Sequence, residues 1–272
     1  MSPRGALRAL VLAGTRQGEP DVIADAAGAS CKALAPVGGQ PMIERPLSVL
    51  LHSGRIAGID AALPVDADVA AESPRLAGWL DERVVKRVEA AASPARTVRA
   101  VLDRLPMDDW LLVTTADHAL LDAAILEQFL GRCEAPGVDA FAGLLPLEIL
   151  EATYPDMRRT GLKLRDGRFS GCNLFLLRNG SAGRALVSFW MRLETLRKSP
   201  LRMALALGPA AVLGYGLRAL SLSRALQMIG RRTGARLAPA ILDIPEAAID
   251  VDSLPDLAFV ESFLAKTHAP RR

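Results

Sequence analysis

The chain has 272 residues, which is long enough to bury a sizeable hydrophobic core without disulfide or metal staples. Half of the residues are hydrophobic and 23% are charged, which excludes a disordered chain. The formal net charge is only +3, so charge does not by itself indicate nucleic-acid binding, and we expect no nucleic-acid partner.

The first half of the chain alternates predicted strands with predicted helices. Ser93 followed by Pro94 is typical of a helix N-terminus, with a hydroxyl cap before a proline at the first helical position. Residues 110–115 are continuously apolar, as in a central strand that is covered on both faces. In chain order, the predicted elements are strand 7–13, helix 41–51, strands 56–63 and 84–90, helix 93–105 and strand 110–115.

The second half continues this alternation around a change of pattern. Between about residues 182 and 233 strand signals vanish, and we expect an all-helical insertion there. The other predicted elements are helix 122–133, strands 138–145, 173–177, 238–244 and 249–252, and helix 254–265. We therefore predict a single α/β domain over residues 1–272, a three-layer Rossmann-like fold with a mostly parallel sheet and helices on both faces.

The predicted insertion contains an apolar stretch that could contact a membrane. Its apolar stretch, residues 203–217, is shorter than the ~20 residues that a membrane span needs. A buried helical hairpin is the simpler interpretation, and peripheral contact with a membrane surface is the alternative. Basic residues flank the stretch, namely Arg197, Lys198, Arg202, Arg218 and Arg224.

The N-terminus and the cysteines favour the cytoplasm. The apolar run at residues 6–13 is too short for a secretory signal and is typical of a buried first strand. Cys31, Cys133 and Cys172 are scattered and lack metal-type spacing, which argues against a disulfide framework and favours a reducing compartment. We expect a cytoplasmic protein, with possible peripheral contact at the inner face of the membrane.

A glycine follows the first predicted strand in Leu12-Ala13-Gly14-Thr15-Arg16. Glycine at that place lets backbone N–H groups approach an anion closely. Arg16 and the more distant Lys32 could neutralise phosphate oxygens. The simpler alternative is a surface loop with solvated charges.

Three carboxylates are candidate metal ligands. Asp117 follows the central strand, at the sheet end where ligands bind in open α/β folds, and could hold Mg²⁺ or merely cap a turn. Alternation along the predicted strand 249–252 places Asp250 and Asp252 on one side, where they repel unless a cation lies between them. The simpler alternative is that Asp252 or Ser253 caps the last helix.

A further candidate site is the helix N-terminus that begins at Ser93. Arg96 and Thr97 lie in its first turn, which suits an anionic or polar ligand, although an ordinary helix cap has the same pattern.

Taken in order, these motifs resemble the MobA-like nucleotidyltransferases of the GT-A type. The most specific match is Pro36-Val37-Gly38-Gly39-Gln40-Pro41-Met42, after Leu12-Ala13-Gly14-Thr15-Arg16 and Lys32. Thr115-Ala116-Asp117 is similar to the family's first metal aspartate, and Asp250-Val251-Asp252-Ser253 to its closing motif. The chain departs from the family in having Thr15 where relatives have a second glycine, and in the long stretch between Arg16 and Lys32.

The resemblance also implies roles for these residues. Arg16 and Lys32 would be catalytic, Mg²⁺ would be held by Asp117, Asp252 and Asp250, and Gly171 and Asn173 would bind the acceptor. The nucleotide would contact Leu12, Ala13, Gly14, Thr15, Arg96, Thr97 and Asp117.

The implied reaction joins an NTP, with CTP slightly favoured, to a sugar- or alcohol-phosphate and releases pyrophosphate. A molybdenum-cofactor guanylyltransferase is one alternative. A GT-A glycosyltransferase and a catalytically inactive nucleotide-binding domain are the others.

Overall fold

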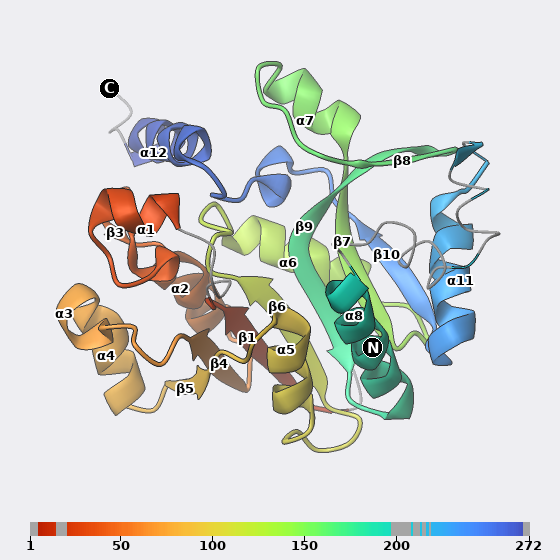
Figure 1. Cartoon of the computed structure of the whole chain (residues 1–272), viewed down its shortest axis with the longest axis horizontal. Helices are drawn as coiled ribbons and strands as arrows, with labels where there is room; N and C mark the ends of the chain where they lie inside the picture. The colour runs from red at the N-terminus through yellow and green to blue at the C-terminus, as the bar shows by residue number, and fades with distance from the viewer. Residues whose placement is uncertain are drawn as a thin grey trace.

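A computed structural model of the chain describes residues 5–14, 21–196, 208, 213, 216–217 and 219–268. Its centre is an eight-stranded sheet in the order β10-β7-β9-β6-β1-β4-β5, with β8 paired to β9 (Figure 1). The strands of this sheet are β1 (Leu7–Leu12), β4 (Gly58–Leu63), β5 (Val85–Glu89), β6 (Trp110–Thr115), β7 (Ala140–Pro146), β8 (Leu162–Leu164), β9 (Gly167–Arg178) and β10 (Leu237–Ile241).

The sheet is mostly parallel, as predicted. β1 pairs in parallel with β4 and β6, β4 with β5, and β7 with β10. β9 runs antiparallel to all three strands that pair with it, β6, β7 and β8. The α/β fold class is therefore confirmed, and the carboxyl ends of β1 and β6 lie side by side at one edge.

Helices cover both faces of the sheet. The helices of the described residues are α1 (Val22–Ala27), α2 (Glu44–His52), α3 (Val69–Glu72), α4 (Pro74–Asp81), α5 (Pro94–Leu102), α6 (Ala123–Arg132), α7 (Leu147–Thr153), α8 (Ser181–Leu196), α11 (Leu222–Thr233) and α12 (Leu254–His268). Short 3-10 helices lie at η1 (Lys32–Leu34) and η2 (Pro245–Ala248).

Two hydrophobic cores explain the three layers. Alternate residues of β1 point to opposite faces, so Ala9 packs in one core and Leu10 in the other. The first core contains residues of α2, α6 and α12, and the second contains residues of α5 and α8. The sheet is thus buried on both sides, which accounts for the uninterrupted apolar sequence of β6.

In the motif regions, the predicted strand 249–252 was wrong, and the predicted helix 41–51 is confirmed with a later start, at Glu44. Residues 249–252 form no strand, because the 3-10 helix η2 and the start of α12 leave only a short connection between them. The Pro-Val-Gly-Gly-Gln-Pro motif forms a small antiparallel hairpin of β2 (Pro36–Val37) and β3 (Gln40–Pro41), and α2 begins after it at Glu44. Gly38 and Gly39 both have positive φ values at the turn, which is why glycines occupy it.

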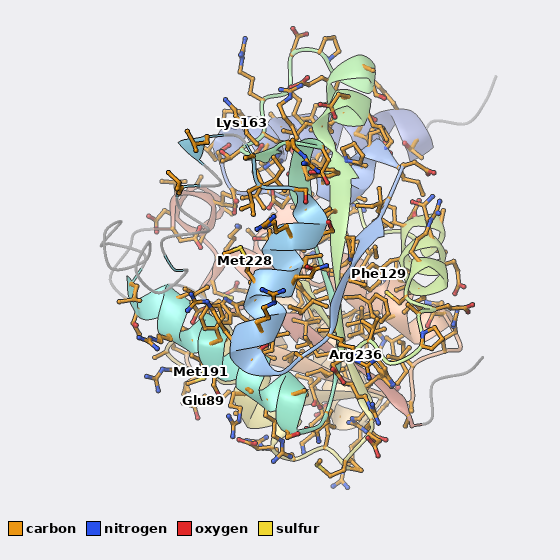
Figure 2. The ribbon with its side chains drawn as sticks, turned by 90° about the vertical axis from the view of Figure 1, so that its right-hand side faces the viewer. Glu89, Phe129, Lys163, Met191, Met228 and Arg236 are labelled. Carbon is orange, nitrogen blue, oxygen red and sulfur yellow. The ribbon has the colours of Figure 1, made fainter. Side chains whose placement is uncertain are left out.

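The predicted helical insertion falls partly outside the described residues. Within residues 182–233, α8 and α11 are helical and lie side by side, with Met191 on α8 and Met228 on α11 (Figure 2). Most of the apolar stretch 203–217 is outside the described residues, so its proposed membrane contact stays a prediction. Among the helices that the structure describes, none has the length and apolar character to cross a bilayer.

Candidate active site

The candidate site lies at the carboxyl ends of β1 and β6. After Leu12, the backbone N–H of Ala13 donates to the carbonyl of Ala62 at 2.9 Å, which fixes the exit of the loop. A Cβ built on Gly14 would lie 3.0 Å from the Cβ of Ala90, just before α5. Close packing therefore favours glycine here and brings the loop against the N-terminal approach to α5. Thr15 and Arg16, the next two residues of the motif, are outside the described residues.

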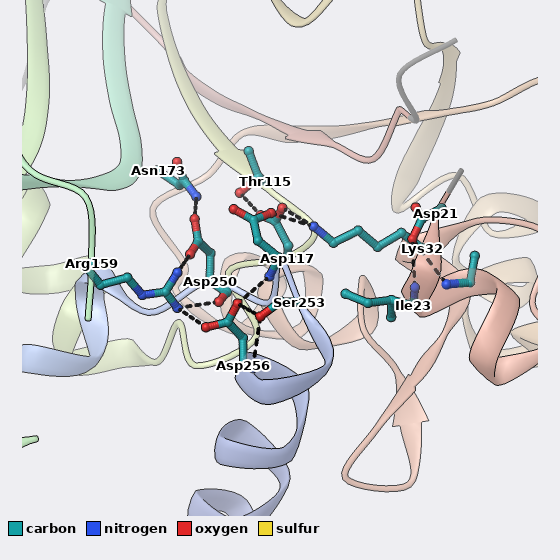
Figure 3. Close-up of polar contacts among 12 residues, drawn as sticks. Asp21, Ile23, Lys32, Thr115, Asp117, Arg159, Asn173, Asp250, Ser253 and Asp256 are labelled. Atoms are coloured by element: carbon teal, nitrogen blue, oxygen red, sulfur yellow. Dashed lines mark hydrogen bonds and ion pairs between the residues drawn. The ribbon is translucent and has the colours of Figure 1, made fainter. Parts of the chain in front are cut away.

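Lys32 connects two carboxylates that are far apart in sequence. Its Nζ lies 2.9 Å from Oδ2 of Asp117, which follows β6, and 2.9 Å from Oδ1 of Asp252, which precedes α12 (Figure 3). Burial disfavours the charged ammonium, but the two carboxylates outweigh it and raise the pKa of Lys32. Lys32 is therefore a cation shared by the two predicted metal ligands.

The two carboxylates are held in this arrangement by their own neighbours. Thr115 Oγ1 donates a hydrogen bond to Oδ1 of Asp117, which leaves Oδ2 for Lys32. The backbone N–H of Val251 donates to the carbonyl of Asp117 at 3.0 Å, which joins the C-terminal connection to the end of β6. Asp252 is more open, with a side chain that is 63% exposed and accessible to a ligand from solvent.

Asp250 does not face Lys32. One carboxylate oxygen pairs with Arg159, and the other accepts a hydrogen bond from Asn173 Nδ2 at 3.0 Å (Figure 3). The expectation that a strand places Asp250 and Asp252 on one side is therefore wrong, because the connection is not extended as a strand. Burial raises the pKa of Asp250 and the Arg159 guanidinium opposes that rise.

Arg159, which the sequence motifs did not single out, bridges this connection. Its Nη2 donates to the backbone carbonyl of Asp250 at 2.6 Å and lies 3.1 Å from Oδ1 of Asp256. The other oxygen of Asp256 accepts from Ser253 Oγ at 2.6 Å and from the Asp252 N–H at 3.3 Å. Arg159 thus contacts residues on both sides of Asp252, and only the tertiary structure shows this.

The predicted cap of the last helix is also observed. Ser253 Oγ accepts from the backbone N–H of Asp256 at 3.4 Å in the first turn of α12. A cap at the start of α12 is compatible with the prediction that Asp252 holds a metal ion. The cap uses the side chain of Ser253, and the carboxylate of Asp252 faces Lys32.

Asn173 has a left-handed backbone, with φ of 49°. It sits where the register between β7 and β9 shifts, opposite the interval from Ala142 to Leu144. Asparagine tolerates this conformation better than most residues, and a bulge turns a side chain out of the regular alternation. The bulge therefore accounts for the position of the Asn173 side chain, which contacts Asp250. The other predicted acceptor residue, Gly171, is exposed, and a Cβ there would meet nothing within 4 Å.

Arg96 and Thr97, the two predicted nucleotide contacts on α5, differ in their exposure to solvent. Arg96 is exposed, whereas Thr97 is 3% exposed. Thr97 Oγ1 accepts from the Ala91 N–H at 2.9 Å and donates to the Ser93 carbonyl at 3.2 Å. Thr97 therefore shapes the 91–93 loop, and Ser93 caps α5 as predicted by accepting from the Arg96 N–H.

His118, beside Asp117, is fully buried, and neither ring nitrogen has a hydrogen-bond partner among the described residues. Burial lowers the pKa of His118 to about 4, so the ring is neutral at physiological pH and adds no charge to the site.

The sequence and the fold of this chain are similar to those of known proteins. A family model described as a MobA-like NTP transferase domain matches residues 9–144, half of the chain. No curated protein matches the sequence. Among solved structures, a hypothetical transferase from Thermus thermophilus is 26% identical with a TM-score of 0.75, covering 93% of this chain and 99% of its own.

Two other solved structures share the fold at lower identity. A 4-diphosphocytidyl-2C-methyl-D-erythritol synthase from Anaerococcus prevotii DSM 20548 is 9% identical with a TM-score of 0.58, covering 96% of this chain and 99% of its own. A CMP:2-keto-3-deoxy-manno-octonic acid synthetase, solved with CTP, is 14% identical with a TM-score of 0.56, covering 97% of this chain and 100% of its own. These two structures are similar to this chain in fold. The family model, which matches half of the chain, shows that the chain belongs to the family of MobA-like NTP transferase domains.

Proposed function

We propose that this protein transfers a nucleotidyl group from an NTP to a phosphorylated small molecule and releases pyrophosphate. The observation that carries the proposal is the convergence of Lys32, Asp117 and Asp252 at the carboxyl ends of the strands. This is the edge where open α/β sheets bind ligands, and it combines one cation with two carboxylates.

The donor set fits a magnesium ion. Asp117 and Asp252 already share one cation, the Lys32 ammonium, and both offer carboxylate oxygens of the kind that Mg²⁺ prefers. Mg²⁺ usually takes one or two protein carboxylates, with phosphates and water as its other ligands. We assign the ion to Asp117 and Asp252, which meet at Lys32, and exclude Asp250 because its carboxylate faces Arg159 and Asn173 instead.

The chain's own residues account for the rest of the chemistry. A bound Mg²⁺ would neutralise phosphate charge at this position. Lys32 then turns from the carboxylates to the α- and β-phosphates, where Arg16 adds a second positive charge. Backbone groups from Leu12 to Thr15 and the 91–97 segment hold the nucleotide, while Gly171 and Asn173 border the acceptor.

The reaction needs no strong base. An oxygen of the acceptor phosphate forms a bond to the α-phosphorus, and the bond from that phosphorus to the α,β-bridging oxygen breaks, so pyrophosphate leaves with the electron pair. Because the attacking oxygen is already anionic, positioning and charge stabilisation suffice. This is why neutral His118 is given no catalytic role.

CTP is the first nucleotide to test. One structural neighbour was solved with CTP, and the one from Anaerococcus prevotii is named as a 4-diphosphocytidyl-2C-methyl-D-erythritol synthase. Guanylyl transfer to a molybdenum cofactor is the second candidate, because the family model is itself of the MobA-like type.

The test has two stages. Thermal shifts with ATP, CTP, GTP, UTP and dTTP, each with and without Mg²⁺, should single out one nucleotide, since saturation at 100 times Kd stabilises by ~2.7 kcal/mol. Pyrophosphate release is then measured with that nucleotide and a series of sugar- and alcohol-phosphates.

Variants of the two candidate metal ligands test whether the release of pyrophosphate depends on this site. Asp117→Asn and Asp252→Asn should abolish the Mg²⁺-dependent shift and the release of pyrophosphate. Asp108→Asn, which removes a 58% exposed carboxylate paired with Arg178 at the opposite end of β6, is the matched control. A flat nucleotide panel with the wild-type protein would overturn the proposal and favour a nucleotide-sugar enzyme or an inactive domain.

A further inference from the structure

The segment that carries Lys32 is joined by hydrogen bonds to the hairpin that follows it. The backbone N–H of Ala35 donates to the carbonyl of Lys32 at 3.1 Å, and that of Ile43 donates to the carbonyl of Ala33 at 2.9 Å. The hairpin of β2 and β3 therefore leaves from the 3-10 helix η1 and returns to it. A shift of the hairpin would be passed to the backbone of Lys32.

The hairpin itself is short. It consists of two residue pairs, Val37 with Gln40 and Pro36 with Pro41. Proline has no backbone N–H, so the second pair forms no hydrogen bond between the two backbones. A two-stranded hairpin is at best marginally stable alone, and its conformation therefore depends on contacts from outside.

Arg45, in the first turn of α2, supplies such a contact. Its Nε and Nη2 donate to the carbonyl of Val37 at 3.0 and 2.8 Å, and Nη2 also donates to the carbonyl of Gly38 at 3.3 Å. Hydrogen bonds from a charged donor are stronger than neutral ones, and the rigid guanidinium fixes the direction of each. A Cβ on Gly38 would lie 2.5 Å from Nη2, so the guanidinium packs directly against the turn.

The helix α12 contacts the hairpin but leaves a gap beside it. A Cβ on Gly38 would lie 3.0 Å from Cδ1 of Leu264, which marks the contact. Next to it lies a cavity of about 350 Å³ between the two elements. Six residues line this cavity, namely Gly38, Gln40 and Arg45 on one side and Glu261, Leu264 and Ala265 on the other. The gap gives the turn room to shift once Arg45 no longer holds it.

The chain is also anchored on the other side of Lys32. The backbone N–H of Ser30 lies 2.9 and 3.0 Å from the two carboxylate oxygens of Glu72, and Ser30 Oγ accepts from the Asp68 N–H at 3.0 Å. These bonds join the residues before η1 to α3. The lysine side chain is a flexible four-carbon stem, so the position of its ammonium depends on how well η1 is held at both ends.

We propose that Arg45 is a positioning residue for Lys32. By holding the hairpin, it keeps η1 where the Lys32 ammonium contacts Asp117 and Asp252 at the same time. Among the described residues, the Arg45 guanidinium donates only to backbone carbonyls of the hairpin, so it acts through Lys32. The effect on turnover rests on the proposed function, whereas the effect on the position of the ammonium does not.

Acetylation of Lys32 tests the proposal on the full chain without nucleotide or metal. The protein is treated with the N-hydroxysuccinimide ester of acetic acid, and mass spectrometry gives the rate for each lysine. The Lys32 side chain is 21% exposed and paired with two carboxylates, so it should react slowly in the wild type. In Arg45→Met its rate should rise about fivefold or more, because the amine is no longer held in both ion pairs. Lys163, exposed on β8, is the internal reference.

Two further variants sharpen this test. Arg45→Lys keeps the charge and most of the stem but not the planar fork of donors, so it should raise the Lys32 rate less than Arg45→Met does. Arg55→Met removes a 41% exposed arginine beyond the other end of α2 and should leave the rate unchanged. The thermal midpoint shows which variants are folded, and Arg45→Lys decides the matter if Arg45→Met is not. An unchanged Lys32 rate in a folded Arg45 variant would overturn the proposal.

Turnover separates this inference from the proposed function. If both hold, Arg45→Met lowers kcat about tenfold, and Lys32→Met/Arg45→Met is no slower than Lys32→Met, because Arg45 acts through Lys32. A further loss of the same size in the double variant would show that Arg45 acts independently and would overturn the proposal. No nucleotidyl transfer by the wild type would refute the proposed function, and the acetylation rates would still decide the role of Arg45.

Discussion

Lys32 and Asp252 are separated by 220 positions in the sequence, yet Lys32 Nζ lies 2.9 Å from Asp252 Oδ1. Asp117, from the end of the central strand, completes the contact at the same distance from the ammonium. The site therefore forms only when the N-terminal, central and C-terminal parts of the chain have docked. The Lys32 ammonium between them also offsets part of the repulsion between the two carboxylates before any ligand is present.

The first prediction concerns this charge balance. Lys32→Met leaves Asp117 and Asp252 to repel each other, so the metal-free variant should melt at a lower temperature than the wild type. Millimolar Mg²⁺ should raise its melting temperature more than that of the wild type, because the ion replaces the lost cation. Turnover should fall by about 100-fold or more, since the charge on the phosphates is no longer offset. Lys163→Met, on the exposed strand β8, is the control.

The second prediction concerns Arg159, whose side chain is 12% exposed. Arg159→Met leaves Asp250 buried without its cation and should destabilise the fold by about 3 kcal/mol in urea unfolding. Arg159→Met/Asp250→Asn should recover much of this loss because the unpaired charge is gone. The control, Arg168→Met, removes an arginine paired with Glu151 at the surface, where solvent screens the charges, and should change the midpoint far less.

Activity gives a separate test of Arg159. If it positions Asp252, the double variant regains stability but still needs more Mg²⁺ for half-maximal turnover than the wild type. An unchanged Mg²⁺ requirement, with only the acceptor KM raised, would instead show direct contact of Arg159 with the acceptor.

The third prediction separates backbone strain from hydrogen bonding at Asn173. Asn173→Gly and Asn173→Ala both lose the bond to Asp250, but only alanine is strained at a φ of 49°. The alanine variant should therefore be less stable than the glycine variant by about 1 kcal/mol in urea unfolding. Equal stabilities would mean that the strand relaxes its backbone at this position.

The fourth prediction is a loss of stability at alkaline pH. Burial raises the pKa of Cys133 and of Cys172 to about 12 from an ordinary value of 9.0. Above pH 9 the unfolded chain releases these protons while the folded chain keeps them, so the free energy of unfolding falls as pH rises. By pH 10 the two thiols together should cost about 3 kcal/mol.

Urea unfolding between pH 8 and pH 10 measures this slope. Cys133→Ala/Cys172→Ala should have a shallower pH dependence than the wild type, whatever its stability at pH 8. Parallel curves for the two proteins would contradict the assignment of buried, protonated thiols.

Much of the fold follows from local sequence patterns. The apolar segment Trp110–Thr115 forms β6 with the predicted bounds, and Ser93 caps α5 as predicted, because burial on both faces and capping leave direct signatures in neighbouring residues. The connection 249–252 was mispredicted as a strand, because alternating apolar and acidic residues also fit a loop with one side against the core. Ile249 and Val251 are buried there without any strand pairing.

By itself, the sequence determined the α/β fold class, the family, and which charged residues follow the strands. The tertiary structure alone decided how those charges pair. Asp250 and Asp252 differ by two positions, yet one lies against Arg159 and the other against Lys32. The apolar run of a buried strand and the cap of a helix are visible in neighbouring residues, whereas the partner of each carboxylate depends on loops that are far apart in the sequence and that the sheet brings together.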